Sequence, residues 1–191
     1  MIKDAINGAS PFHAVKFYES RESLCQIVAD FLSEGLVQQQ PALAIATPEH
    51  RAGILAELRG RNLDVDRLQA TGLLTLLDVS DLLDGFMVDG MPDAALFIAA
   101  TSLAIERACR DRKDVTVRAY GEMVDVLWKA GHDAAAIRVE LLWNKLAMTH
   151  DFSMLCGYSM GTFYKDADLA AIHGQHSHVV SRLGALVPAS Q

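Results

Sequence analysis

The chain has few residues of the kinds that tie a protein together covalently or anchor it in a bilayer. It contains three cysteines among 191 residues, Cys25, Cys109 and Cys156, with no CxxC spacing. An odd number of widely spaced cysteines argues against a disulfide framework and favours a reducing compartment. No apolar run reaches the roughly 20 residues that span a bilayer, and the N-terminus lacks the apolar core of a signal peptide. We therefore expect a cytoplasmic protein without a membrane segment.

Runs of basic residues are also missing. The formal net charge is −7, and no lysine- or arginine-rich segment offsets it. Nucleic-acid binding depends on basic side chains that neutralise phosphates, so this balance predicts no direct contact with DNA or RNA. Hydrophobic residues make up 51% of the chain and charged residues 21%, which is enough apolar material for a sizeable core.

Phosphate-binding loops are the third absence. A P-loop needs glycines that bring backbone N–H groups to phosphate and a lysine for charge. After the first expected strand the chain reads "FYESRESL", with no glycine or lysine, and Glu19 and Glu22 stand where anionic phosphates would sit. The GxGxxG fingerprint is absent too. We predict no cofactor, no catalytic residue and no P-loop ATP chemistry.

Apolar strands and helix-length segments alternate along the chain. The strands are expected at residues 13–18, 41–47, 72–78, 114–123 and 152–160. This alternation predicts an α/β fold of three layers, a mostly parallel sheet of about five or more strands with helices on both faces. We expect a loose lead-in at 1–11, a single domain at 12–185 that ends in helices, and a frayed tail at 186–191. A short helix and a loop are expected at 79–92, and this loop is the candidate mobile element.

The carboxyl ends of parallel strands are where such sheets bind ligands. Polar residues follow or end the expected strands there, and a rim of this kind is usual for a small-molecule pocket. Helix capping is the alternative role for some of them. The candidates at this edge are Tyr18, Asp78, Arg118, Glu122, Cys156 and Tyr158. His13 begins the first strand, at the opposite edge, and is either a structural histidine or evidence of a second site.

A cysteine and three histidines lie close together near the C-terminus, in "FSMLCGYSM" and "HGQHSHVV". His173 and His176 would share a helical face, whereas His178 would point elsewhere. No pair has the spacing of a zinc ribbon, so we predict no metal site. Cys156 follows apolar residues, and burial makes a thiol inert, so packing is favoured over nucleophilic catalysis.

Trp128 and Trp143 lie in amphipathic helical segments, where core packing or an interface is expected. Glu140 and Asn144 flank Trp143 in "VELLWNKL". These four residues are the candidates for a protein interface.

With these residues in view, the chain resembles the MEDS family, the methanogen/methylotroph DcmR-type sensory domain. The resemblance covers about residues 12–180 and follows an ordered set of segments. These are "FHAVKFYES", "FLSEGL", "VRAYGEMVDVLWKAG", "VELLWNKL", "FSMLCGYSM" and "QHSHVV". It implies a relative of the RecA/KaiC-type fold without a phosphate loop, and it adds His176 to the candidate ligand-binding residues.

The resemblance also implies a sensory, non-catalytic role. Family members are often joined to DNA-binding, histidine kinase or anti-sigma-type modules and are proposed to sense simple hydrocarbon derivatives. We see no such module here, so a homo-oligomer and a separate partner, such as a histidine kinase or a transcription regulator, are expected. Three hypotheses stand: a sensor of a small organic ligand, a pure interaction module with a vestigial pocket, and an enzyme that uses Cys156 or a nucleotide.

Overall fold

The computed structural model describes residues 12–110, 112, 114–162, 172, 174–181 and 186–189. Its main sheet has seven strands in the order β3-β2-β6-β7-β1-β8-β9. All neighbours in this order run parallel except β8 and β9, which are antiparallel. The strands are β1 (Phe12–Tyr18), β2 (Ala42–Ala46), β3 (Leu74–Asp78), β6 (Val117–Gly121), β7 (Phe152–Ser159), β8 (His178–Val180) and β9 (Leu186–Pro188). The five parallel strands expected from the sequence are therefore confirmed.

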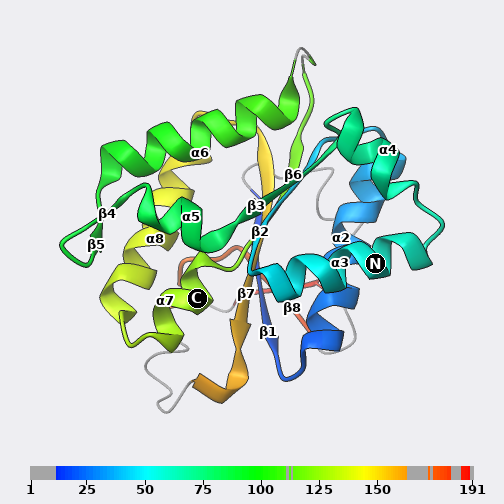
Figure 1. Ribbon diagram of the computed structural model, residues 1–191. Helices are drawn as coiled ribbons and strands as arrows, with labels where there is room; N and C mark the ends of the chain where they lie inside the picture. Colours follow the sequence, from blue (N-terminus) through cyan, green and yellow to red (C-terminus); the bar gives the residue numbers. More distant parts are fainter. Residues whose placement is uncertain are drawn as a thin grey trace.

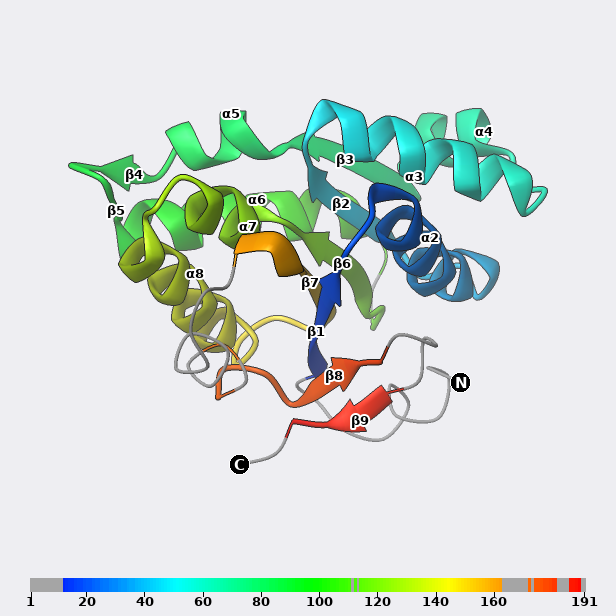
Figure 2. The ribbon, with the colours of Figure 1, turned by 90° about the horizontal axis from the view of Figure 1, so that it is seen from below.

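Helices cover both faces of this sheet, which confirms the three-layer α/β fold (Figure 1, Figure 2). One face carries α2 (Arg21–Val37), α3 (Pro48–Gly60) and α4 (Val65–Ala70). The other carries α5 (Val79–Asp84), α6 (Ala94–Cys109), α7 (Met123–Lys129) and α8 (Asp133–Leu146). Among the described residues, no helix has both the length and the apolar character needed to cross a bilayer.

Helix starts follow the capping residues of the sequence. The side chains of Ser20, Thr47, Asp78 and Asp93 accept hydrogen bonds from backbone N–H groups in the first turns of α2, α3, α5 and α6. Asp78 is thus a helix cap, the alternative role that the sequence left open for it. Asp64 caps α4 in the same way, in a segment where we expected only turns.

Three local expectations differ from the structure. Residues 178–180 form β8, where a helix was expected, and residues 186–188 form β9, where we expected a frayed tail. Val179 is β-branched and half-buried beside β1, and pairing with that strand decides the conformation. The loop expected after α5 is a hairpin of β4 (Met87–Val88) and β5 (Met91–Pro92). Residues 1–11 lie outside the described part.

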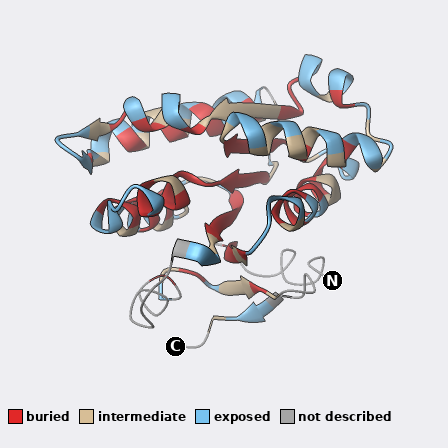
Figure 3. Cartoon of the chain, turned by 60° about the horizontal axis from the view of Figure 1, so that its bottom comes forward, coloured by how far each residue is buried: buried red, intermediate tan, exposed pale blue. Residues whose placement is uncertain are grey.

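The core has two halves, one on each face of the sheet. The residues of β1, β2, β6 and β7 are almost all buried, whereas those of β3 are mostly half-buried (Figure 3). On the α6–α8 side, Trp143 is 1% exposed and lies edge-on to Phe97 and Phe152, with ring centroids 5.3 and 5.6 Å away. Offset and edge-on aromatic pairs of this kind add to the stabilisation that comes from apolar burial.

Replacement of Trp143 by alanine should therefore destabilise the fold. We expect the free energy of unfolding, from urea denaturation, to fall by about 3–5 kcal/mol because a large buried side chain leaves a cavity. Leu141→Ala is the matched control on the same helix, since Leu141 is 44% exposed. A Trp143→Ala protein as stable as the control would contradict this packing.

Candidate functional site

Five polar side chains meet inside the protein between the sheet and α8. His13 comes from β1, Cys156 and Tyr158 from β7, Glu140 from α8, and His176 from the segment before β8. Their exposed fractions are 4% for His13, 0% for Glu140 and Tyr158, 1% for Cys156 and 7% for His176. We call these five residues the Glu140 cluster. Figure 2 shows α8 and the chain that leads into β8 on the same side of β1.

Glu140 lies at the centre of this cluster. The Tyr158 hydroxyl donates a hydrogen bond to Glu140 Oε1 (2.9 Å), and His176 Nε2 is 3.4 Å from the same oxygen. His13 Nε2 is 3.3 Å from Glu140 Oε2 and 3.2 Å from Cys156 Sγ. The Cys156 thiol is 3.8 Å from Glu140 Oε2. Segments far apart in the sequence therefore converge on one buried carboxylate.

The outer ring nitrogens of both histidines are held by fixed partners. His176 Nδ1 is 2.7 Å from the Ile172 carbonyl, which can only accept, so this nitrogen carries the proton. Asn144 Nδ2 donates to the Gln175 carbonyl (2.9 Å), which turns Asn144 Oδ1 toward His13 Nδ1 at 2.8 Å. His13 Nδ1 therefore donates as well. In the neutral form, both inner Nε2 atoms present a lone pair to the cluster.

Burial and charge shift the acid–base behaviour of the cluster. Burial alone would raise the pKa of the Glu140 carboxyl, but the His176 and His13 imidazoles outweigh it and hold that pKa well below its usual range. Burial, followed by the charge of Glu140, raises the pKa of the Cys156 thiol well above its ordinary value. Burial lowers the pKa of His176, yet Glu140 outweighs this effect and raises it. At neutral pH Glu140 is a carboxylate and Cys156 a protonated thiol.

A second carboxylate, Glu122, is buried at the carboxyl end of β6. It accepts hydrogen bonds from the backbone N–H of Thr47 and from the Tyr120 hydroxyl (3.0 Å), and His50 Nδ1 is 2.5 Å away. Burial by itself would raise the pKa of Glu122, but the contacts with His50 and Thr47 lower it. Glu122 therefore fastens the start of α3 to the end of β6.

Tyr18 also lies at the carboxyl-end edge of the sheet, where it belongs to a separate hydrogen-bonded group. Its hydroxyl donates to Asp125 (2.7 Å), which in turn accepts from Lys129 at 2.7 Å and from the Ser159 backbone at 2.8 Å. Tyr18, Glu122 and Tyr158 thus lie near the carboxyl ends of their strands, as the sequence predicts. Only Tyr158 belongs to the Glu140 cluster.

Two candidate ligand residues lie elsewhere. Arg118 is the second residue of β6, so it is far from the carboxyl end where we expected it. Its side chain points to the α2 face, where Nε donates to Gln40 (2.9 Å) and the guanidinium lies 5.4 Å from the Phe31 ring. Asp78 caps α5 and accepts from Arg51 at 2.6 Å. Strand alternation and capping explain both positions.

Burial corrects the expectation that four residues form a protein interface. Trp128 is 6% exposed, Trp143 is 1% exposed and Glu140 is 0% exposed. Asn144 is half-buried and holds His13. The first two belong to the core and the last two to the site. His178 stacks on Phe12 at 5.4 Å, apart from the cluster, and His173 lies outside the described residues.

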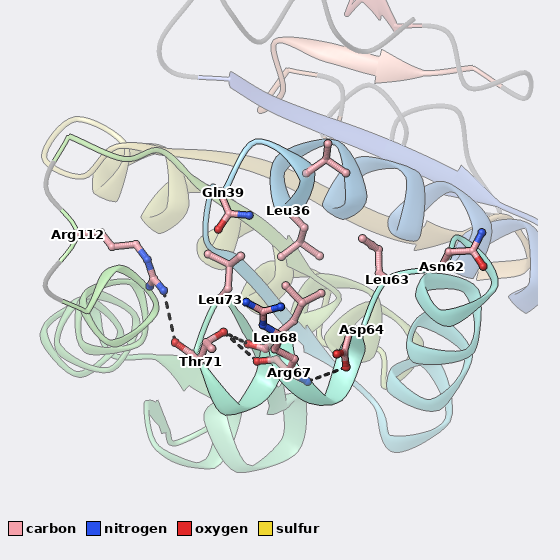
Figure 4. Close-up of a pocket in the computed structure, with 11 residues that line it drawn as sticks. Leu36, Gln39, Asn62, Leu63, Asp64, Arg67, Leu68, Thr71, Leu73 and Arg112 are labelled. Atoms are coloured by element: carbon pink, nitrogen blue, oxygen red, sulfur yellow. Dashed lines mark hydrogen bonds between the residues drawn. The ribbon is translucent and has the colours of Figure 1, made fainter.

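A surface groove of about 450 Å³ lies near the amino ends of β2 and β3, away from the Glu140 cluster (Figure 4). Arg112 donates to the Thr71 carbonyl (3.4 Å) at one end of it, and the Thr71 hydroxyl donates to the Arg67 carbonyl (2.9 Å). Arg112 and Thr71 are thus engaged in contacts at the end of α4, and none of the candidate residues from the sequence lines the groove.

Comparison with protein-family models gives a match over most of the chain. The family model described as "MEDS: MEthanogen/methylotroph, DcmR Sensory domain" matches residues 12–177. The chain belongs to the MEDS family. A search of curated proteins found no match. The matched part of this MEDS domain contains every member of the Glu140 cluster, together with Asn144.

The central position of Glu140 in this MEDS domain was not predicted from the sequence. A signal for it was present, because Glu140 is a charged residue on the apolar side of α8, between Val139 and Trp143, where a side chain exposed to solvent is not expected. His13 lies near the start of β1, as expected, but Cys156 lies inside β7 rather than at the carboxyl end where the sequence placed it. The register pairs His13 with Met154, so Cys156 is only two residues farther along the neighbouring strand.

The Glu122 contacts predict an acid-dependent part of the stability. A carboxyl whose folded pKa lies below the unfolded value of about 4.3 stabilises the fold above that value, and the stabilisation is lost as pH falls through the folded pKa. Glu122→Gln should cost about 1–3 kcal/mol in free energy of unfolding at neutral pH, and the deficit should shrink below about pH 4. Denaturation at several pH values measures it, with the exposed Glu106→Gln as control. A deficit that stays constant on acidification would contradict the assignment.

Proposed function

We propose that this MEDS domain is a sensory module that binds a small molecule and regulates a signalling protein without catalysing a reaction. Membership of a sensory family gives the coarse role. The Glu140 cluster carries the finer proposal, because it gathers titratable side chains of four segments in one buried place. Such groups are uncommon in a core unless they serve a function or are fully paired.

The Glu140 cluster contacts residues 174–181, so a ligand bound at the cluster can change how this segment packs. Ser177 N and Ser177 Oγ both donate to the His13 carbonyl at 2.8 Å, and Asn144 donates to the carbonyl of Gln175. Residues 174–181 therefore dock on β1 and α8 through contacts next to His13 and His176. Residues 174–181 can be docked on β1 and α8 or released from them. A ligand that binds the protein in one of these two states better by about 1–3 kcal/mol would shift the equilibrium between them.

The absence of catalysis is supported by the chemistry of the same groups. The raised pKa of Cys156 keeps it a thiol, whereas nucleophilic catalysis requires a thiolate. Ser20 after β1 caps α2, and its neighbours Glu19 and Glu22 are acidic rather than phosphate-binding.

Protection from hydrogen exchange tests this proposal. Short-chain alcohols, aldehydes and halomethanes are added to the protein one at a time. We expect at least one of these classes to raise the melting temperature by a few degrees and to slow hydrogen exchange in residues 174–181. Glu140→Gln should abolish both effects, because it removes the charge that joins the segments. Arg67→Gln, in the distant groove, should leave both unchanged.

The same measurements define the results that would exclude this proposal. Flat melting temperatures and unchanged exchange for the whole panel, together with no signalling protein retained by the wild-type domain in pull-downs, would exclude the sensory proposal. An effect that Arg67→Gln removes and Glu140→Gln leaves intact would place the input in the groove instead.

A pure interaction module is the second candidate, and exposed apolar residues on two packed helices favour it. Leu96 and Leu103 lie seven residues apart on α6 and are 46% and 45% exposed, and Leu141 on α8 is 44% exposed. Residues with this spacing share a helical face, and exposed apolar faces are used as interfaces.

Sedimentation velocity tests this surface. If α6 and α8 mediate self-association, the double variant Leu96→Ser, Leu103→Ser should shift the protein to monomer, because it removes apolar area from the contact. Val37→Ser, 71% exposed on α2 at the other face, is the control and should leave the assembly state unchanged. An unchanged sedimentation coefficient in the double variant would remove this helix face from consideration.

A further inference from the structure

The Glu140 cluster has more acceptors than donors. Its inner groups are two Nε2 lone pairs, from His13 and His176, and the two oxygens of Glu140. The donors are the Tyr158 hydroxyl and the weak thiol of Cys156. His176 Nε2 is fully buried and forms no hydrogen bond with any residue that the structure describes. The nearest partner of this buried nitrogen is Glu140 Oε1 at 3.4 Å, and a positive charge between the two would satisfy both groups.

The distances within the cluster suit a shared ion better than direct hydrogen bonds. His13 Nε2, Glu140, Cys156 Sγ and His176 offer ligand atoms that all lie within 4.8 Å of one another. The two histidine–carboxylate contacts, at 3.3 and 3.4 Å, are longer than ordinary hydrogen bonds between nitrogen and oxygen. Ligands bound tetrahedrally to zinc at about 2.0–2.3 Å are separated by roughly 3.3–3.8 Å. Four contacts in the cluster, from 3.2 to 3.8 Å, are close to such separations.

The charges of these side chains and the orientation of the two histidines also favour a bound metal ion. Metal binding would release the thiol proton of Cys156 to solvent. The resulting thiolate and the Glu140 carboxylate together carry the charge that neutralises a divalent cation, and two neutral imidazoles complete a four-ligand set of types that zinc accepts. The outer nitrogens of both histidines donate to oxygen acceptors, Asn144 Oδ1 and the Ile172 carbonyl. Ligating histidines are usually held in this way, with the inner nitrogen directed at the metal.

We propose that His13, Glu140, Cys156 and His176 bind one divalent transition-metal ion, for which zinc is the best fit. The proposal replaces the expectation from the sequence that no metal site is present. It deepens the proposed function, on which it rests for its role, because the metal would occupy the sensor's input site. The ion would fasten the segment that carries His176 to β1 and α8.

Metal binding can be measured on the full chain alone. After chelation and dialysis, titration with Co²⁺ should saturate at one equivalent and give a thiolate-to-cobalt charge-transfer band, which Zn²⁺ removes by displacement. Cys156→Ser should abolish the band. Cys25→Ser should keep it, since Cys25 is a buried thiol on the opposite face of the sheet. The wild-type stoichiometry, from elemental analysis, does not depend on whether any variant folds.

The orienting role of Asn144 gives a second, graded test. Asn144→Ala should weaken Zn²⁺ affinity by about 10–100-fold while the cobalt band keeps its shape, because the ligands themselves are unchanged. His50→Gln is the matched control, since His50 pairs with Glu122 away from this cluster and its loss should leave the affinity unchanged. Zinc affinity unaffected by Asn144→Ala would contradict the site as drawn.

Failure of this inference and failure of the proposed function give different results. Absence of bound metal in the wild type, or a charge-transfer band that survives Cys156→Ser, would overturn the metal site and leave a buried histidine–glutamate pair. The exchange response of residues 174–181 to organic ligands would still support a sensor. Stoichiometric metal with no ligand response and no partner would instead support a metal site and exclude the sensory proposal.

Discussion

The burial of one carboxylate, Glu140, is the constraint on which this part of the structure depends. A charge that is wholly removed from water must be compensated, and here the compensation comes from β1, β7 and the segment before β8. The docking of the C-terminal segment and the placement of His13 against Cys156 both follow from that requirement.

Two buried glutamates of this protein, Glu122 and Glu140, have different roles. Glu122 has a backbone N–H, a tyrosine hydroxyl and a histidine as close partners, so its hydrogen-bonding capacity is well used. Glu140 has one hydrogen bond of ordinary length, from Tyr158 at 2.9 Å, whereas its histidine and cysteine contacts are 3.3 Å or longer. The nearby His176 Nε2 makes no hydrogen bond with a described residue. The first arrangement joins α3 to the sheet and suits a structural role. The second leaves capacity for a cation, and it lies within the region that matches the sensory family.

The strands could be read only partly from the sequence, and their order in the sheet not at all. Apolar runs separated by amphipathic helices correctly predicted five parallel strands and helices on both faces, because burial on both sides leaves a continuous hydrophobic signal. The short β8 and β9 gave no such signal, since their pairing with β1 and with each other decides their conformation. The proposed kinship with RecA/KaiC-type proteins stays a prediction.

The sequence by itself determined the layered fold and the loss of a phosphate loop, and it named His13, Cys156 and Tyr158 as candidates, to which the family resemblance added His176. Only the tertiary structure decided which of them meet. It placed Arg118 on the other face, put Glu140 at the centre instead of at an interface, and brought His13 beside Cys156. The physical reason is that strand alternation and register fix where a side chain points, and register depends on contacts between segments more than a hundred residues apart.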